Sequence, residues 1–199
     1  TRCVRWLTSI NMSHKSNSPI RISIISNQAF SLLNFRGPLI ADMVIRGIDV
    51  FALAPDYDKA TRAEVRALGA KPVDFSLSRT GMNPLRDAAD MLRLTFLLRR
   101  LKPDMTLAYA IKPVIYGTFA AWLARIPRRF AMIEGLGYVF TLPEGTEPLK
   151  RKALRTMVSM LYATALRRAN MVFFLNKDDI DEFSKKRIVP PAKAYLLGG

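Results

Sequence analysis

The chain has 199 residues, half of them hydrophobic, which is enough for one good hydrophobic core. Its formal net charge of +15 predicts a polyanionic partner, namely nucleic acid, anionic lipid or a phosphorylated substrate. One cysteine and one histidine exclude a disulfide framework and zinc-ligand spacing, and the single cysteine fits a reducing compartment.

Residues 1–19 contain a Ser/Asn cluster with a few cations and lack the apolar core of a signal peptide. We interpret them as a disordered extension or an expression remnant. The longest uncharged runs, 22–35 and 113–124, are shorter than the roughly 20 apolar residues that a membrane-spanning helix needs. The sequence therefore predicts a soluble or peripheral protein.

From residue 20 onward, short apolar or β-branched runs alternate with segments of helical periodicity. The predicted strands are 20–26, 48–54, 72–77, 105–110, 130–133, 171–175 and 194–197. Six helices are predicted between these strands. The first three run from Pro38 to Gly47, from the Asp58 cap to Gly69, and from the Asn83 cap to before Pro103. The last three run from Pro113 to Arg125, over 149–169, and from the Asn176 cap to Lys186. This alternation predicts an α/β fold, a Rossmann-like doubly wound parallel sheet with right-handed crossovers.

Two of the predicted loops, 110–112 and 134–138, leave the carboxyl ends of strands, where open α/β sheets bind ligands. Lys112 would lie on this edge and could meet a diphosphate as a point charge, although a solvated lysine fits equally well. Gly135 and Gly137 would let the backbone approach a ligand closely, or would simply form a tight turn.

The first strand-to-helix turn has no GxGxxG pattern, which argues against an NAD-binding enzyme. Arg36 precedes the helix predicted to open at Pro38, and a helix N-terminus beside a guanidinium would form an anion site. The alternative is an ordinary loop with an exposed arginine. We expect neither Arg36 nor Lys112 to lie in the core.

The predicted helix 149–169 contains cations and no acid. Its cations are Lys150, Arg151, Lys152, Arg155, Arg167 and Arg168, and its apolar stripe is Leu154, Met157, Val158, Leu161 and Ala165. The stripe favours core packing, whereas the cationic flank predicts contact with anionic lipid. The helix predicted from the Asn83 cap to before Pro103 carries an apolar stripe of its own, formed by Leu85, Ala88, Ala89, Leu92 and Phe96.

No catalytic set is visible in the sequence. The histidine lies in the N-terminal extension, and the glutamates form no acid/base pair at helical spacing. We therefore expect this chain to supply part of an active site and no catalytic residue of its own.

Five motifs in order give the sequence a specific resemblance. They are NFRGPL (34–39), SRTGMNPLRD (78–87), YAIKPVIYG (109–117), EGLGYVF (134–140) and FFLNKDDIDEF (173–183). From about residue 20 to 199 the chain resembles the N-terminal domain of family 4 glycosyltransferases of the GT-B fold. It is most similar to the branch that builds capsule, O-antigen and lipid-linked oligosaccharides, and would cover about the first half of such an enzyme.

The resemblance implies that a sugar is transferred, with retention, from a UDP-linked nucleotide donor to a polyprenyl-diphosphate-linked glycan. It implies no metal or other cofactor for this reaction. It implies a peripheral enzyme on the cytoplasmic face of the membrane. Residues 20–199 would be the acceptor-side domain, and the donor-binding domain with its paired glutamates would be absent. By motif match the acceptor site would contain Asn34, Arg36, Arg79, Lys112, Glu134, Gly135 and Gly137.

Two departures from the family pattern stand out. Ser26-Asn27 replaces the Gly-Gly that many relatives carry after the first strand, and Glu134 replaces their histidine. Two other classes fit the charge, namely a nucleic-acid-binding module and a stand-alone interaction protein. No helix-turn-helix, RNA-binding sheet signature or aromatic-interleaved basic patch favours the nucleic-acid module.

Overall fold

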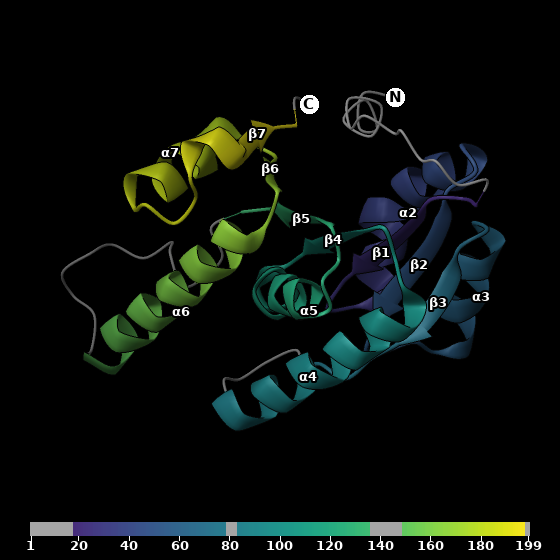
Figure 1. Cartoon of the computed structure of the whole chain (residues 1–199), viewed down its shortest axis with the longest axis horizontal. Coiled ribbons are helices and arrows are strands. Elements are labelled where there is room, and N and C mark those ends of the chain that lie inside the picture. Colours follow the sequence, from purple (N-terminus) through teal and green to yellow (C-terminus); the bar gives the residue numbers. More distant parts are fainter. Residues whose placement is uncertain (1–17, 79–82, 136–148, 198–199) are drawn as a thin grey trace.

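The computed structural model describes residues 18–78, 83–135 and 149–197, with the side chains of 149–152 and 154 excepted. Its centre is a seven-stranded sheet in the order β3-β2-β1-β4-β5-β6-β7, in which every neighbouring pair is parallel (Figure 1). The strands are β1 (Arg21–Ile25), β2 (Asp49–Ala54), β3 (Lys71–Asp74), β4 (Met105–Tyr109), β5 (Arg128–Ile133), β6 (Met171–Phe174) and β7 (Ala194–Leu196). The predicted Rossmann-like doubly wound sheet is confirmed.

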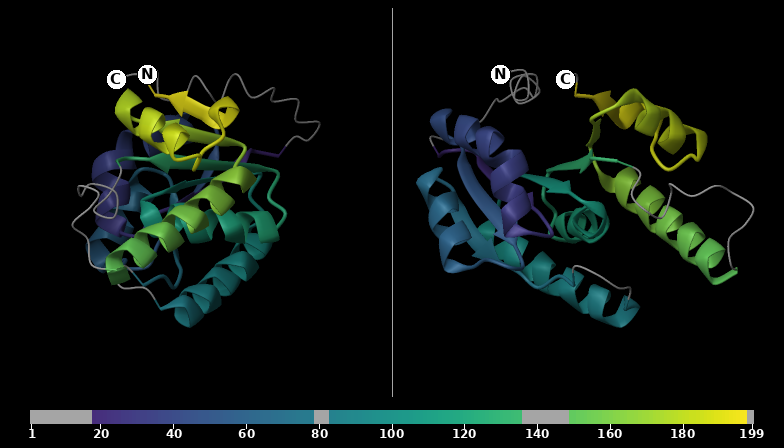
Figure 2. Two further views of the ribbon diagram at one scale, coloured as in Figure 1. Left: turned by 90° about the vertical axis from the view of Figure 1, so that its left-hand side faces the viewer. Right: turned by 180° about the vertical axis from the view of Figure 1, so that it is seen from behind.

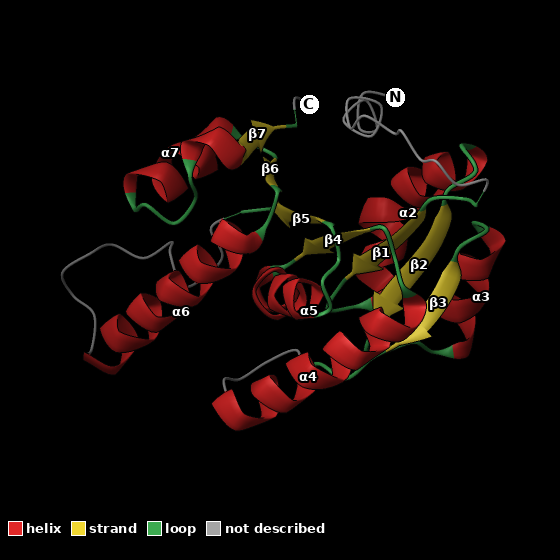
Figure 3. Cartoon of the chain, in the orientation of Figure 1, coloured by secondary structure: helices red, strands yellow, loops and turns green. Residues whose placement is uncertain are grey.

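Helices cover both faces of the sheet (Figures 1 and 2). The helices α2 (Ala29–Ile45) and α3 (Lys59–Ala67) form one layer, and α4 (Pro84–Leu101), α5 (Thr118–Leu123), α6 (Leu149–Arg168) and α7 (Lys177–Lys185) belong to the other. Figure 3 shows this alternation of strands and helices along the chain. Because side chains alternate along a strand, Ile24 packs in the core under α2, while Ile25 packs in the core under α4 and α5.

The first helix differs from its prediction. It begins at Ala29, so Pro38 lies inside it and not at its start. An internal proline costs one helical hydrogen bond and about 3 kcal/mol. Against that cost, Leu32, Ile40 and Met43 are fully buried on one side of the same helix, and each buried side chain of this kind stabilises by about 1.5–3 kcal/mol. The packing of the whole helix face therefore outweighs the local preference of Pro38.

The other predicted helix ends are largely confirmed. Asp58 and Thr61 form a reciprocal capping box at the start of α3, and Asn83 caps α4 with Pro84 as its first residue. Gly47 and Gly69 follow α2 and α3 with φ of +78° and +82°, as helix-terminating glycines do. The strand β3 ends at Asp74 and is shorter than predicted.

The helix predicted from Pro113 begins as a wider turn. The segment η2 (Pro113–Gly117) is a π-helical turn that continues into α5. A Cβ atom at Gly117 would lie 3.3 Å from the Ile25 side chain, so the glycine lets this turn pack closely against β1. Such π turns are frequent at functional sites.

The apolar stripes of α4 and α6 differ in exposure. In α6, Val158 and Ala165 are buried, as the core interpretation predicts, whereas Met157 of the same stripe is 38% exposed. In α4 the stripe faces away from the sheet, and Leu85 is 85% exposed. The described residues contain no helix with the length and hydrophobicity to cross a bilayer.

Candidate functional site

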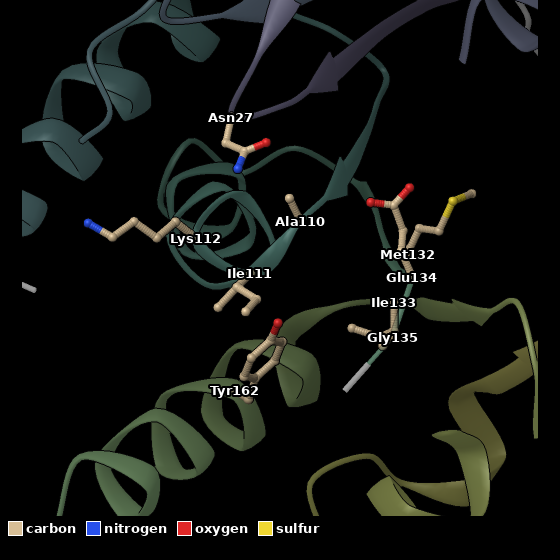
Figure 4. Close-up of a pocket in the computed structure, with 9 residues that line it drawn as sticks. All are labelled: Asn27, Ala110, Ile111, Lys112, Met132, Ile133, Glu134, Gly135 and Tyr162. Carbon is tan, nitrogen blue, oxygen red and sulfur yellow. The ribbon is translucent and has the colours of Figure 1, made fainter. Parts of the chain in front are cut away.

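A cavity of about 410 Å³ opens at the carboxyl edge of the sheet, where β1, β4 and β5 end (Figure 4). The lining consists of Asn27, Ala110, Ile111, Lys112, Met132, Ile133, Glu134, Gly135 and Tyr162. Both predicted ligand-edge loops contribute to it, and Tyr162 of α6 closes one side. Its size falls in the range of small-molecule sites.

Ala110 forms the turn from β4 into the cavity in an unusual backbone conformation. Its φ is +69°, in the left-handed region that residues with a Cβ rarely adopt. Its carbonyl oxygen accepts a hydrogen bond of 2.9 Å from the Val114 amide and so begins the helical turn that follows. Strain of this kind costs on the order of 1–3 kcal/mol and is concentrated at binding sites.

Lys112 lies on the predicted edge, but its charge is already paired. The stem lines the cavity, while the amine turns away from it (Figure 4) and donates a 2.9 Å hydrogen bond to Asp87 Oδ1 of α4. The Asp87 side chain is 1% exposed, and its other oxygen accepts from the Tyr116 hydroxyl at 3.2 Å. Burial, and then the Asp87 carboxylate, raise the pKa of Tyr116 to about 12, so this hydroxyl remains a donor. The Lys112 side chain is 13% exposed, and it is neither the free cation nor the solvated lysine that the sequence left open, because its amine compensates a buried carboxylate.

Arg36 also differs from its predicted setting. It lies within α2, not at a helix start, and forms an ion pair with Glu134. Its guanidinium lies 4.9 Å from the centre of the Tyr109 ring, and its Nε is buried without a hydrogen-bond partner among the described residues. Burial raises the pKa of Tyr109 to about 12, so the ring stays neutral beneath the cation. The Arg36–Glu134 pair thus connects α2 to the cavity wall.

At the observed N-terminus of α2, backbone amides already donate hydrogen bonds to side chains of the protein itself. The Ala29 amide donates a 2.7 Å hydrogen bond to Asp56 Oδ1, and the Gln28 amide donates to the Ser26 hydroxyl. Because a carboxylate already occupies the positive end of the helix dipole, the anion site predicted from Arg36 and a helix start does not exist in that form.

The remaining predicted site residues divide into three groups. Asn34 is exposed on α2 and does not line the cavity, whereas Gly135 does. Arg79 and Gly137 lie outside the described residues. Lys150, Arg151 and Lys152 belong to α6, but only their backbone is described, and the half-buried Arg155 lines a separate hollow beside Met160 and Lys186.

Several residues of the site were missed in the sequence. Asn27 and Tyr162 line the cavity, Asp87 pairs with the lining Lys112, and the Tyr109 ring lies against Arg36, the partner of the lining Glu134. Asp87 follows Pro84 in the first turn of a helix, where an acid ordinarily signals only a favourable dipole contact. Tyr162 lies beside the predicted apolar stripe of α6. Burial raises the pKa of its hydroxyl, which therefore stays protonated. The hydroxyl points toward the cavity (Figure 4).

A parallel sheet with a small-molecule cavity at the carboxyl ends of its central strands defines a ligand-binding domain of the Rossmann-like class. The family model described as glycosyl transferase 4-like matches residues 38–176. The chain belongs to this family, which confirms the resemblance carried by its motifs.

A Campylobacter jejuni protein is 31% identical over 162 residues, covering 81% of this chain and 42% of that protein. It is an N,N'-diacetylbacillosaminyl-diphospho-undecaprenol α-1,3-N-acetylgalactosaminyltransferase. The chain therefore spans less than half the length of this relative.

Solved structures share the fold at low identity. A glycosyltransferase from Rickettsia africae has a TM-score of 0.63 at 9% identity and covers 92% of this chain and 43% of that one. MurG from Acinetobacter baumannii has a TM-score of 0.56 at 12% identity, with coverages of 91% and 45%. UDP-GlcNAc 2-epimerase from Neisseria meningitidis has a TM-score of 0.59 at 14% identity, with coverages of 89% and 45%. These likenesses concern the fold alone, which is that of GT-B proteins.

Proposed function

We propose that this chain forms the acceptor side of a retaining glycosyltransferase that moves a sugar from a nucleotide donor, UDP-linked, to a polyprenyl-diphosphate-linked glycan. Family membership supports sugar transfer, and the Campylobacter relative acts on such a lipid-linked acceptor. The observation that carries the acceptor role is the cavity at the ends of β1, β4 and β5, lined by Lys112 and by Glu134-Gly135. Retention and the donor class rest on the family resemblance.

The charges at the cavity suggest how a diphosphate would be held. Lys112 is compensated by Asp87, so its contribution to an incoming anion is reduced. Arg36 has a buried Nε without a described partner, and the side chain of its ion-pair partner Glu134 is about a third exposed. In the proposed complex the diphosphate replaces Glu134 against the guanidinium, as a charge-assisted bidentate contact.

Calorimetric titration with a soluble short-chain polyprenyl-diphosphate sugar tests this arrangement. A charge-assisted hydrogen bond contributes about 1.5–3 kcal/mol, so Arg36→Ala should weaken binding about tenfold to a hundredfold. Glu134→Gln should strengthen binding of the diphosphate, because it removes the competing carboxylate.

Arg62 supplies a matched control away from the cavity. Its guanidinium donates to Asp74 at 2.8 Å and lies 5.1 Å from the centre of the Tyr57 ring, contacts of the same kind as those of Arg36. Arg62→Ala should leave acceptor affinity unchanged. If Arg36→Ala bound the probe as tightly as Arg62→Ala does, the diphosphate would lie elsewhere.

The proposal extends to location and pathway class. Sugar transfer to a membrane-bound acceptor would place the protein peripherally on the inner face of the cytoplasmic membrane, in the synthesis of capsule, lipopolysaccharide or a related surface glycan. The cations at the start of α6, Lys150, Arg151, Lys152 and Arg155, are proposed to face anionic lipid there. We propose no nucleic-acid partner and no metal requirement.

A further inference from the structure

The outward face of α4 combines exposed apolar side chains with exposed arginines. Leu85, Leu92 and Phe96 are 85%, 50% and 64% exposed, and the small Ala89 lies between them at helical spacing. With 3.6 residues per turn these four fall on one stripe. Figure 3 shows α4 along the border of the molecule, with no described element on its outer side.

In α4 the acidic side chains are buried and the arginine side chains are exposed. Its two acids, Asp87 and Asp90, are both 1% exposed, and they pair with Lys112 and Arg93. Its arginines are all exposed, namely Arg86, Arg93, Arg99 and Arg100. Arg86 and Arg100 lie on one flank of the apolar stripe and Arg99 on the other.

Three helices of this layer, α4, α5 and α6, expose no carboxylate among the described residues, whereas α7 carries the exposed Asp178 and Asp181. Neither α5 nor α6 contains an acidic residue, and their exposed apolar side chains include Trp122, Met157 and Met160. On the opposite layer, cations are interleaved with exposed partners such as Asp74. The face formed by α4, α5 and α6, which exposes apolar and cationic groups and no described carboxylate, matches an anionic surface with an apolar interior.

We propose that the outward face of α4, defined by Leu85, Ala89, Leu92 and Phe96 with Arg86, Arg99 and Arg100, lies in the interface of an anionic lipid bilayer. The apolar stripe enters the boundary between headgroups and acyl chains, and the flanking guanidiniums bind lipid phosphates. The 18 residues of α4 give a straight contact about 27 Å long, which suits a flat surface. This deepens the proposed membrane setting, on which it rests, by assigning the contact to α4 and not only to α6.

Co-sedimentation of the 199-residue chain with vesicles tests the assignment. Vesicles of phosphatidylglycerol and phosphatidylcholine are compared with vesicles of phosphatidylcholine alone at about 0.1 M salt, where screening is moderate. Each cation near an anionic surface raises the partition coefficient between water and membrane about fivefold. The double substitution Arg86→Gln with Arg100→Gln should therefore lower this coefficient about thirtyfold. Leu92→Ser with Phe96→Ser should lower it at least about tenfold.

The matched control changes the same residue types on the other layer. Ile45 on α2 is 83% exposed and Arg66 on α3 is exposed, so Ile45→Ser with Arg66→Gln removes a comparable side-chain pair. This variant should bind vesicles as the parent does. Melting temperatures of all variants, followed by circular dichroism, should match the parent, because every substituted side chain is exposed.

The proposal fails if the parent binds anionic vesicles no better than neutral ones, if the α4 variants retain parental binding, or if the control loses as much binding as the α4 variants do. Loss of binding only on substituting Lys150, Arg151, Lys152 and Arg155 by glutamine would assign the contact to α6 instead. The vesicles contain no acceptor, so these results are independent of the acceptor titration that tests sugar transfer.

Discussion

The pair between Lys112 and Asp87 gives the sharpest prediction for stability. Lys112→Met keeps the aliphatic stem and removes the amine, so Asp87 would retain one neutral donor, the Tyr116 hydroxyl at 3.2 Å. The Asp87 side chain is 1% exposed and cannot gain water without local opening. Removing one member of a buried ion pair costs about 3–5 kcal/mol. For a domain of this size that corresponds to a fall in melting temperature of about 10 °C.

Urea denaturation at pH 7, followed by circular dichroism, measures this cost. The midpoint should fall while the slope with urea stays constant, because the same surface is exposed on unfolding. Lys112→Met combined with Asp87→Asn should recover a large part of the loss, since the second substitution removes the uncompensated charge. A double-mutant cycle over these variants should give a coupling of about 2 kcal/mol or more.

A second lysine in the same protein provides the control. Lys71 Nζ donates to Asp49 at 2.8 Å, yet the lysine side chain is 58% exposed. Lys71→Met should cost less than about 1 kcal/mol, as solvated surface pairs do. Equal destabilisation by Lys112→Met and Lys71→Met would refute the reasoning, because burial would then not decide the strength of the pair.

Three further outcomes are expected. Ala110→Gly should change the unfolding free energy by less than about 0.5 kcal/mol in urea titration, because relief of the φ of +69° offsets the added flexibility of the unfolded chain, whereas Ala110→Val should destabilise by at least about 1 kcal/mol. Hydrogen bonds from Thr61 hold the pKa of Asp58 below its usual value. The stability that the Asp58 carboxylate adds is therefore complete above about pH 4, and it is lost as the pH falls through the lowered pKa. Melting curves should accordingly separate Asp58→Ala from the parent at pH 7 and bring them together in strong acid. The 199-residue chain alone should transfer no sugar to a lipid-linked acceptor in a radiolabel assay, because Glu134 is the single carboxylate among the described residues that line the cavity and no acid/base pair is formed there.

The order of strands and helices could be predicted because its signals are local. Buried parallel strands such as β4 are apolar throughout, and caps such as Asp58 and Asn83 act on the next few residues of the chain. The edge of the sheet that carries the cavity followed from the same pattern, since parallel strands end together. The start of α2 could not be predicted, because packing of Leu32 and Ile40 outweighs the local preference of Pro38.

The state of each charged group in the site depends on partners far apart in sequence. Lys112 and Arg36 both resembled free anion-binding cations, and their partners are 25 and 98 residues away. Likewise, the stripe of α4 has the periodicity of a core helix, and periodicity alone does not say which face of a helix meets the sheet.

The sequence by itself therefore determined the fold class, the family and the edge of the sheet where a ligand would bind, since hydrophobic period, caps and motifs are written in neighbouring residues. Only the tertiary structure decided that Asp87 compensates Lys112, that Glu134 pairs with Arg36 and that the apolar face of α4 is exposed on the protein surface. The reason is physical: whether a charge is free and whether an apolar side chain is buried depend on which elements pack together across the sheet.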